Sequence, residues 1–500
     1  MTSTILTLVT FLPLAGAVLL ALLPRRDELM RRVALATSLL TFAISLYLPI
    51  NFETGRGGFQ FEISQAWIQS PAIRYHLGID GISLWLVLLT TFLTPLCVLI
   101  SWRSVGERVK EFFVLLMILE TALTGVFVAL DLFLFYFFWE ATLVPMALLI
   151  GMYGHERRVY AAVKFFLFTA IASVFMLAAI IWLYAKTGSF DFIAVQAALR
   201  GGTVENLSAA APWLFLGFFI AFAVKVPIFP LHTWLPDAHV EAPTAGSVLL
   251  AGVLLKMGTY GLLRFNLGLF PEQSRVHAPW IVALAIIGII YGALVAMVQP
   301  NLKKLVAYSS VSHLGFVVLG IFTFTTAGTD GAVFQMLSHG VSTGALFMLV
   351  GMIYERRHTF EIRQFGGLAT PMPVYATIFL LVTLSSIGLP LLNGFIGEFL
   401  ILTGAFQARS LYGVLGATGV IWSAAYMLWM YQRVFYGNVQ QEANAAVPDL
   451  SMREQITLWP TAVAALVMGV APLIWLGPID ASVQAALTPF MEMAKQVLGR

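Results

Sequence analysis

The feature that most constrains this chain is the recurrence of apolar stretches from one end to the other. An α-helix needs about 20 apolar residues to cross the hydrocarbon core of a bilayer. Hydrophobic residues make up 59% of the 500 residues and charged residues 11%, whereas a soluble domain carries roughly 25% charged residues. The sequence therefore predicts an all-α integral membrane protein with about fourteen transmembrane helices.

The expected spans run through the whole chain. They are placed at residues 3–23, 33–51, 82–101, 112–130, 131–152, 160–184, 212–235, 245–264, 279–299, 305–326, 331–354, 374–407, 411–433 and 456–477. The first apolar stretch is of full spanning length and its arginines follow it, so we expect a retained first helix and not a cleaved signal.

The basic residues indicate how the helices are oriented. With the N-terminus outside the cytoplasm, seventeen of the 28 lysines and arginines fall on the cytoplasmic side and nine on the other side. Positively charged loops stay cytoplasmic, so both termini are expected on the periplasmic side of a bacterial inner membrane. The remaining two basic residues, Lys225 and Lys256, lie inside apolar stretches.

Composition excludes several classes of function. The formal net charge of +3 is spread thinly, without the basic patch that binds a nucleic-acid backbone. The chain has one cysteine, Cys97, and so lacks the set of thiolates that an iron–sulfur cluster or a zinc-thiolate site requires. We therefore expect the lipid bilayer as its surroundings, with no nucleic-acid partner, no metal and no cofactor on this chain.

Two of the expected spans contain helix breakers. Residues 212–235 include Pro230, and residues 374–407 include Gly388 and Pro390. Proline removes a backbone donor, and glycine weakens a helix. Irregular backbone persists at membrane depth only where protein or a water-filled cavity satisfies its polar groups, so both breaks are candidates for an ion path.

The two breaks are related by position. Pro230-Leu231 and Pro390-Leu391 are 160 residues apart, a distance that covers five spans, so a displaced copy would be inverted in the membrane. We expect two inverted five-helix repeats, each containing a broken helix. The expected division is a three-helix segment at 1–111, repeats at 112–264 and 279–433, and a C-terminal loop and helix at 434–500.

Ionisable residues inside the spans are the candidate functional residues. A charge at the bilayer centre costs about 2.5–3.5 kcal/mol, so it needs a partner and usually a role. Glu140, Lys225, Lys256 and Glu398 meet this description, and Glu120 also lies mid-span. The lysines could instead snorkel to the headgroups, and Glu120 could be a neutral buried acid. We expect a proton relay in which Glu140 lies beside Lys225.

Histidines are candidates for the intermediate steps of such a relay. His313 and His339 lie in spans among serines and small residues. An imidazole can pass protons between a lysine and a carboxylate, although either residue could also be a neutral packing histidine. His232 and His239, in PLHTWLPDAHVEAPTAG, match no standard zinc spacing, and we expect a hydrated polar entrance there. Four further histidines fall in loops and have no expected role: His76, His155, His277 and His358.

Several longer motifs resemble a known family. They are KVPIFPLHTWLPDAHVEAPTAGSVLLAGVLLKMGTYG (225–261), FYFFWEATLVPM (135–146), QPNLKKLVAYSSVSHLG (299–315), QMLSHG (335–340) and LPLLNGFIGEF (389–399). They are similar to the antiporter-like subunits of complex I, the respiratory NADH:quinone oxidoreductase, and of the related multisubunit cation/proton antiporters. The sibling chains L and N of that family carry a lysine where this sequence has Glu398, so the resemblance is to the branch with a carboxylate there.

This resemblance implies a non-redox subunit of the enzyme that moves protons from cytoplasm to periplasm. It assigns Glu140 and Lys225 to a first half-channel, Lys256 and the histidines to the link, and Glu398 to the exit. It also implies FMN, iron–sulfur clusters and quinone on partner subunits, with chains L and N and small membrane chains as neighbours. The alternatives are a subunit of a cation/proton antiporter without redox partners and a purely structural membrane-arm subunit.

Overall fold

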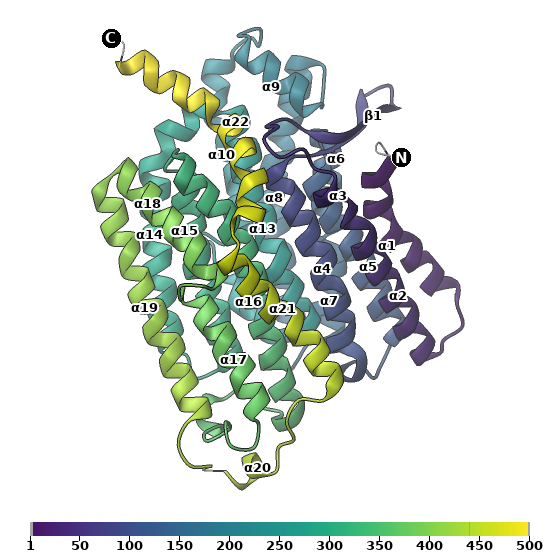
Figure 1. Cartoon of the computed structure of the whole chain (residues 1–500). Coiled ribbons are helices and arrows are strands. Elements are labelled where there is room, and N and C mark those ends of the chain that lie inside the picture. The colour runs from purple at the N-terminus through teal and green to yellow at the C-terminus, as the bar shows by residue number, and fades with distance from the viewer. Residues whose placement is uncertain (1–3, 440, 499–500) are drawn as a thin grey trace.

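The fold is a bundle of long helices with both chain ends at the same end of the bundle (Figure 1). We call this the termini end; β1 (Gln60–Ile68) also lies there, and α20 (Glu442–Ala445) lies at the opposite end. The computed structural model describes residues 4–439 and 441–498.

The elements follow one another as antiparallel crossings of the bundle. The first half contains α1 (Ile5–Leu22), α2 (Asp27–Ser45), α3 (Tyr47–Ile50), β1, β2 (Ile73–Ile79), α4 (Gly81–Ser104), α5 (Val109–Val128), α6 (Leu132–Ala141), α7 (Leu143–Tyr153), α8 (Arg158–Thr187), α9 (Phe192–Arg200), α10 (Leu207–Lys225), α11 (Trp234–Glu241), α12 (Thr244–Leu249), η2 (Leu250–Leu254), α13 (Leu255–Gly261) and η3 (Leu262–Leu267). The second half contains α14 (Pro271–Met297), α15 (Leu302–Ile321), α16 (Thr326–Arg357), η4 (Ile362–Gln364), α17 (Pro373–Ser386), α18 (Asn393–Ala408), α19 (Ser410–Phe435), α20, α21 (Met452–Val470) and α22 (Leu473–Leu498).

The number of candidate spans is slightly below the fourteen expected from the sequence. Among the described residues, twelve helices are long and apolar enough to cross a membrane, and the bent pair α21–α22 makes a thirteenth. The remaining expected span, at 374–407, is divided into the short helices α17 and α18. The predicted all-α membrane fold is confirmed, while the inverted relation between 112–264 and 279–433 stays a prediction.

The last expected span, 456–477, is wrong as a single helix. α21 ends at Val470 and α22 begins at Leu473, with an angle of 67° between them. Pro472 lies in the break, and it has no backbone N–H to continue the ladder of hydrogen bonds. The chain therefore bends at this proline, and α22 continues to the termini end (Figure 1).

Both expected helix breaks are present, and side chains satisfy their freed backbone groups. α10 ends at Lys225 and α11 begins at Trp234, whose indole Nε1 donates to the carbonyl of Val224 at 2.9 Å. At the second break, Asn393 bonds the hydroxyl of Ser385, and its side-chain oxygen accepts from the N–H of Gly394 at 3.0 Å. These contacts replace the water that the hydrocarbon interior cannot supply.

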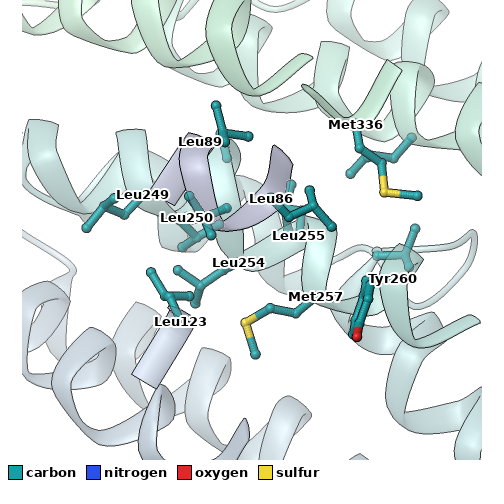
Figure 2. Close-up of a cluster of buried hydrophobic side chains, with 14 of the residues drawn as sticks. Leu86, Leu89, Leu123, Leu249, Leu250, Leu254, Leu255, Met257, Tyr260 and Met336 are labelled. Atoms are coloured by element: carbon teal, nitrogen blue, oxygen red, sulfur yellow. The ribbon is translucent and has the colours of Figure 1, made fainter. Parts of the chain in front are cut away.

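The segment from α12 to η3 contains two π-helical turns that sequence reasoning did not predict. η2 and η3 lie on either side of α13, which carries Lys256. π-Helical turns are rare in proteins, and those that occur are often found at functional sites. Figure 2 shows Leu249, Leu250 and Leu254 packed with side chains of α4, α5 and α16, so this irregular helix is held on all sides by apolar contacts.

A two-stranded hairpin at the termini end was also not predicted. β1 and β2 pair antiparallel within a region expected to be loop. His76 of β2 is buried; its Nδ1 lies 2.5 Å from a carboxylate oxygen of Asp191, and its Nε2 lies 3.4 Å from Glu62. Burial lowers the pKa of His76, but the hydrogen bonds and charges of Asp191 and Glu62 outweigh burial and raise it. His76 thus joins the hairpin to the start of α9.

Glycines let α16 and α18 approach closely. A Cβ on Gly331 would lie 2.6 Å from the backbone nitrogen of Ile401, whereas a Cβ on Gly288 would meet nothing within 4 Å. Gly331→Ala should lower the stability of the protein by about 1–3 kcal/mol, because overpacking forces the backbone to move. Thermal unfolding of the detergent-solubilised protein measures this, with Gly288→Ala as the control that loses nothing. Equal melting temperatures for the two variants would contradict the close packing.

His76→Gln should destabilise the protein in a pH-dependent way. Because the pKa of His76 is raised in the folded state, its contribution is complete below the unfolded-state value of about 6.5 and disappears as pH rises through the folded-state value. Melting temperatures of the variant and the original protein should therefore differ by several degrees at pH 6 and converge at high pH. The exposed His358 supplies the control, His358→Gln, with a pH-independent difference. A melting-temperature difference between His76→Gln and the original protein that grows as pH rises would contradict this prediction.

Candidate functional site

Four buried residues form a polar chain that runs from α13 of the first half to α16, α15 and α18 of the second half. Nζ of Lys256, on α13, lies 2.6 Å from Nδ1 of His339 on α16. The rings of His339 and His313, the latter on α15, have centroids 5.8 Å apart. Nδ1 of His313 lies 3.1 Å from Oε1 of Glu398 on α18. The tertiary structure therefore brings four sequence-predicted residues into one line.

Every member of this chain is shielded from lipid. The relative exposure is 0% for Lys256, 2% for each histidine and 3% for Glu398. Lys256 also donates to the carbonyl of Ala251, in the π-helical turn η2. Snorkelling to the headgroups is excluded for this lysine, because its ammonium bonds groups inside the bundle.

Polar side chains surround the Glu398 end of the chain. Gln335 donates to Oε1 of Glu398 at 3.4 Å, and the hydroxyl of Ser386 lies 3.4 Å from Nε2 of His313. A Cβ on Gly388 would come within 2.9 Å of Glu398, so the glycine of the second break makes room for the carboxylate. The break therefore leaves backbone groups without helical partners and also makes room for the carboxylate of Glu398.

Lys225 occupies a different environment from Lys256. Its Nζ lies 5.3 Å from the ring centroid of Trp139 and 5.4 Å from that of Phe165. The charge of Glu140 acts on Lys225, but their side chains form no ion pair within 4.0 Å among the described residues. A cation held over aromatic faces in a dry site is stabilised by the ring quadrupoles, and the carboxylate is near it without contact.

The first lysine is not connected to the second in this structure. Nζ of Lys225 has no hydrogen-bond partner among the described residues. Phe222, one turn before Lys225 on α10, packs against Trp139 and Phe135 between the two regions. A proton that passes from Lys225 to Lys256 therefore requires water or a movement of side chains.

His232 and His239 do not form one cluster, which corrects the single entrance expected from their spacing. His232 packs beside Tyr291 and Phe229, and the charge of Lys164 acts on it; Lys164 itself bonds Asp237 at 2.6 Å. His239 faces the other way. The physical reason is that His232 lies in the turn before α11 and packs against Tyr291 of α14, whereas His239 lies within α11 and packs against α16.

His239 lies against the second half of the molecule. Its ring stacks on Phe347 of α16, with centroids 4.4 Å apart. The residue is fully buried, and neither ring nitrogen has a hydrogen-bond partner among the described residues. The charges of Lys256 and Lys303 both act on it. It is thus electrostatically part of the Lys256 region.

Glu120 stands apart from the polar chain. It is fully buried on α5, with the hydroxyl of Thr94 and the thiol of Cys97 among its neighbours. No basic side chain bonds it in the described part of the protein. A carboxyl group that is buried without a cation is more stable in its neutral form. The surroundings of Glu120 therefore agree better with a neutral buried acid than with a role in the proton relay.

Sequence reasoning missed two buried basic residues at the ends of spans. Lys303 was expected on the cytoplasmic surface, but it is 2% exposed and donates to the carbonyl of Ala242 at 2.6 Å. Arg264 is the last residue of the expected span 245–264, and it bonds Asp80 at 2.6 Å. Asp80 also caps α4 through the N–H groups of residues 82 and 83. The residues DGIS (80–83) match a helix-capping motif, which indicated a structural role for Asp80. No local sequence pattern indicated that Lys303 or Arg264 is buried.

The arrangement suits proton transfer and offers no cluster for a metal ion. Within residues 4–439 and 441–498, no group of three or more histidine, cysteine, aspartate or glutamate side chains is positioned to hold one. Lysine, imidazole and carboxylate in contact can each bind and release a proton. Broken helices, a buried charged chain and irregular backbone at membrane depth define the class of antiporter-like transport proteins.

The comparisons with known proteins identify the family within this class. Residues 129–423 match the family described as NADH:quinone oxidoreductase/Mrp antiporter, and residues 8–126 match the amino terminus of NADH-ubiquinone oxidoreductase chain 4. The chain belongs to this family, in the branch of the antiporter-like subunit M of NADH:quinone oxidoreductase. The family that the sequence motifs resemble is thereby confirmed.

Relatives match over almost their full length. The chain is 46% identical to NADH-quinone oxidoreductase subunit M of Rhodobacter capsulatus, covering 94% of this chain and 93% of that protein. It is 45% identical to NADH-ubiquinone oxidoreductase chain 4 of Marchantia polymorpha, covering 94% of each. A chain of respiratory complex I from Thermus thermophilus superposes with a TM-score of 0.87 at 34% identity, covering 96% and 99%. A chain of the Mrp complex from Dietzia sp. DQ12-45-1b has a TM-score of 0.85 at 20% identity, covering 98% of each, and shares the fold alone.

Proposed function

We propose that this chain moves protons across the membrane as a non-redox subunit of an NADH:quinone oxidoreductase. The observation that carries the proposal is the buried polar chain from Lys256 through His339 and His313 to Glu398. Burying so many ionisable groups at membrane depth costs several kcal/mol. A purely structural subunit would gain nothing from that cost, whereas a proton relay requires it.

The proposed route runs from the cytoplasm to the periplasm, with the termini end on the periplasmic side. Glu140 and Lys225 form the first half-channel, Lys256 and the histidines form the link, and Glu398 is the exit site. Moving one charge outward costs about 2.3 kcal/mol per 100 mV, so redox chemistry on other subunits must drive it. Those subunits hold FMN, iron–sulfur clusters and quinone, and this chain contacts the antiporter-like chains L and N in a bacterial inner membrane.

The inverted repeats 112–264 and 279–433 give this route its two halves. The first break follows Lys225, and the second break precedes Glu398. Helices α10–α11 and α17–α18 therefore place one ionisable residue at each break. This correspondence supports the proposal that the two residues open toward opposite sides of the membrane.

A cation/proton antiporter subunit without redox partners is the alternative from another class. Co-isolation from the native membrane distinguishes the two, because flavin and iron–sulfur subunits accompany only the oxidoreductase. A structural role makes a third alternative. It predicts that neutralising the buried residues changes assembly and leaves transport unchanged.

Glu398→Gln should abolish most proton transport in the assembled complex. Glutamine preserves the shape of the carboxylate beside His313 and Gln335 but cannot bind and release a proton. Because a positioned proton-transfer group contributes about 10²–10⁴-fold, proton uptake per NADH oxidised should fall about 10-fold or more in proteoliposomes. The exposed Glu272 provides the matched control, Glu272→Gln. Transport at the original rate in Glu398→Gln would overturn the proposed exit site.

Lys225→Met and Glu140→Gln should each lose the part of proton transport that enters through the first half-channel. Methionine fills the space among Trp139 and Phe165 but carries no charge, and glutamine removes the carboxylate that acts on Lys225. The measurement is again proton uptake per NADH oxidised, with Lys186→Met at an exposed lysine as the control. Normal assembly together with full transport in both variants would contradict the first half-channel.

A further inference from the structure

A cavity of about 550 Å³, lined by both polar and apolar side chains, opens at the opposite end of the bundle. It lies between the ends of α4, α7 and α16 and the start of α12, and its lining includes Glu107, His155, Thr244 and Glu355. We call it the vestibule. None of its lining residues belongs to the relay described above, and the relay leaves the vestibule unexplained.

The inner wall of the vestibule is bonded to the end of the broken helix α11. The backbone N–H of His155 donates to the carbonyl of Glu241 at 3.0 Å, and the N–H of Arg157 donates to its carboxylate at 2.9 Å. Burial and the charge of Lys303 lower the pKa of His155 to about 4. A positive charge therefore lies directly behind this wall.

That charge is Lys303, at the start of α15. Its ammonium donates to the carbonyls of Ala242 and Val240, at 2.6 and 3.3 Å, and lies 5.2 Å from the ring of Phe360, which also lines the vestibule. These carbonyls are at the C-terminal end of α11, where the helix dipole favours a cation. An ammonium has three donors, so one N–H remains beyond these two bonds.

His239 directly precedes Val240, whose carbonyl accepts from Lys303. The charges of Lys303 and Lys256 both act on it, and its own charge acts on His339. Both of its ring nitrogens lack a hydrogen-bond partner among the described residues, although the ring is fully buried. A buried imidazole without partners is costly, which points to a transient partner at this position.

We infer that the vestibule is a second cytoplasmic proton entrance, which delivers protons through Lys303 and His239 to Lys256 without passing Lys225. The inference rests on the proposed function of proton transport. It goes further because it gives Lys256, and the residues that follow it in the relay, a separate supply of protons. It also accounts for the missing connection between Lys225 and Lys256 and for the separation of His232 from His239.

Each transfer in this route conserves protons. An N–H bond of the Lys303 ammonium breaks as an N–H bond forms on His239, and a hydronium ion that enters the vestibule from the cytoplasm returns a proton to the Lys303 amine and becomes water. The protonated imidazole then gives a proton to the neutral amine of Lys256 and becomes neutral again. Neither step is a direct hydrogen bond in the structure, so each requires one bridging water or a side-chain rotation.

The decisive variants separate proton transfer from packing. Lys303→Arg keeps a cation that can cap α11, but a guanidinium does not release protons in proteins. His239→Phe keeps the ring stack on Phe347 and removes both nitrogens. In the assembled complex reconstituted in proteoliposomes, each should lower proton uptake per NADH oxidised to the share that enters at Lys225, and Lys303→Arg combined with Lys225→Met should lower it by about 10-fold or more. His277→Gln, at the termini end, is the control and should transport normally.

Chemical access gives a readout independent of transport. Thr244→Cys adds a thiol to the vestibule, while the chain's one cysteine, Cys97, is buried. A membrane-impermeant trimethylammonium methanethiosulfonate, added on the side where NADH is oxidised, should label the variant and slow its proton uptake. The unmodified chain should not react. A Thr244→Cys thiol that stays unlabelled from that side would overturn the vestibule as an entrance.

The outcomes distinguish this inference from the proposed function. If Glu398→Gln loses transport while Lys303→Arg and His239→Phe retain it, the relay stands and the second entrance is wrong. If Glu398→Gln and Lys225→Met also transport normally, the proposed function itself fails. Loss of transport in Lys303→Arg and His239→Phe with labelling of Thr244→Cys supports the entrance.

Discussion

The structure depends on the rule that backbone polar groups cannot remain unpaired in hydrocarbon. Helices satisfy it along most of the chain, and the two breaks satisfy it with side chains, through Trp234 at the first and Asn393 at the second. Parts of both breaks, such as Pro230 and Leu391, are nevertheless exposed on the surface. The ionisable residues next to the breaks, Lys225 and Glu398, are buried.

The two halves of the site differ in how their charges are held. Lys225 lies among aromatic rings with Glu140 near but not bonded, whereas Lys256 joins His339 and so the chain that ends at Glu398. Within that chain the rings of His339 and His313 lie 5.8 Å apart between centroids, and Nε2 of His339 has no hydrogen-bond partner among the described residues. A proton crosses this step only with water or a side-chain rotation, and Lys225 needs the same before it reaches Lys256.

The irregular helix around Lys256 shows how local geometry serves the site. Two π-helical turns flank the lysine, and one of them offers the carbonyl of Ala251 to its ammonium. Apolar side chains from neighbouring helices surround this segment (Figure 2). In surroundings with few polar groups, a small change in a neighbour's charge has a large effect on whether the lysine holds its proton. This sensitivity is what coupling between distant charges requires.

The sequence alone determined the membrane fold, the two breaks and the residues of the relay. Apolar length, proline and glycine positions and charges stranded in hydrocarbon are local properties, and each can be recognised without knowing what lies nearby. Lys225, Lys256 and Glu398 could be chosen for that reason. The motifs that resemble the family supplied their proposed order.

Only the tertiary structure decided which of these residues meet. His313 and His339 lie on different helices, and their alignment with Lys256 and Glu398 depends on how α13, α15, α16 and α18 pack. Packing also buried Lys303 at a span end that resembled surface, and it placed His232 against α14 and His239 against α16. The physical reason is that burial and contact arise between segments far apart in the chain, whereas the sequence pattern reports only on neighbours along it.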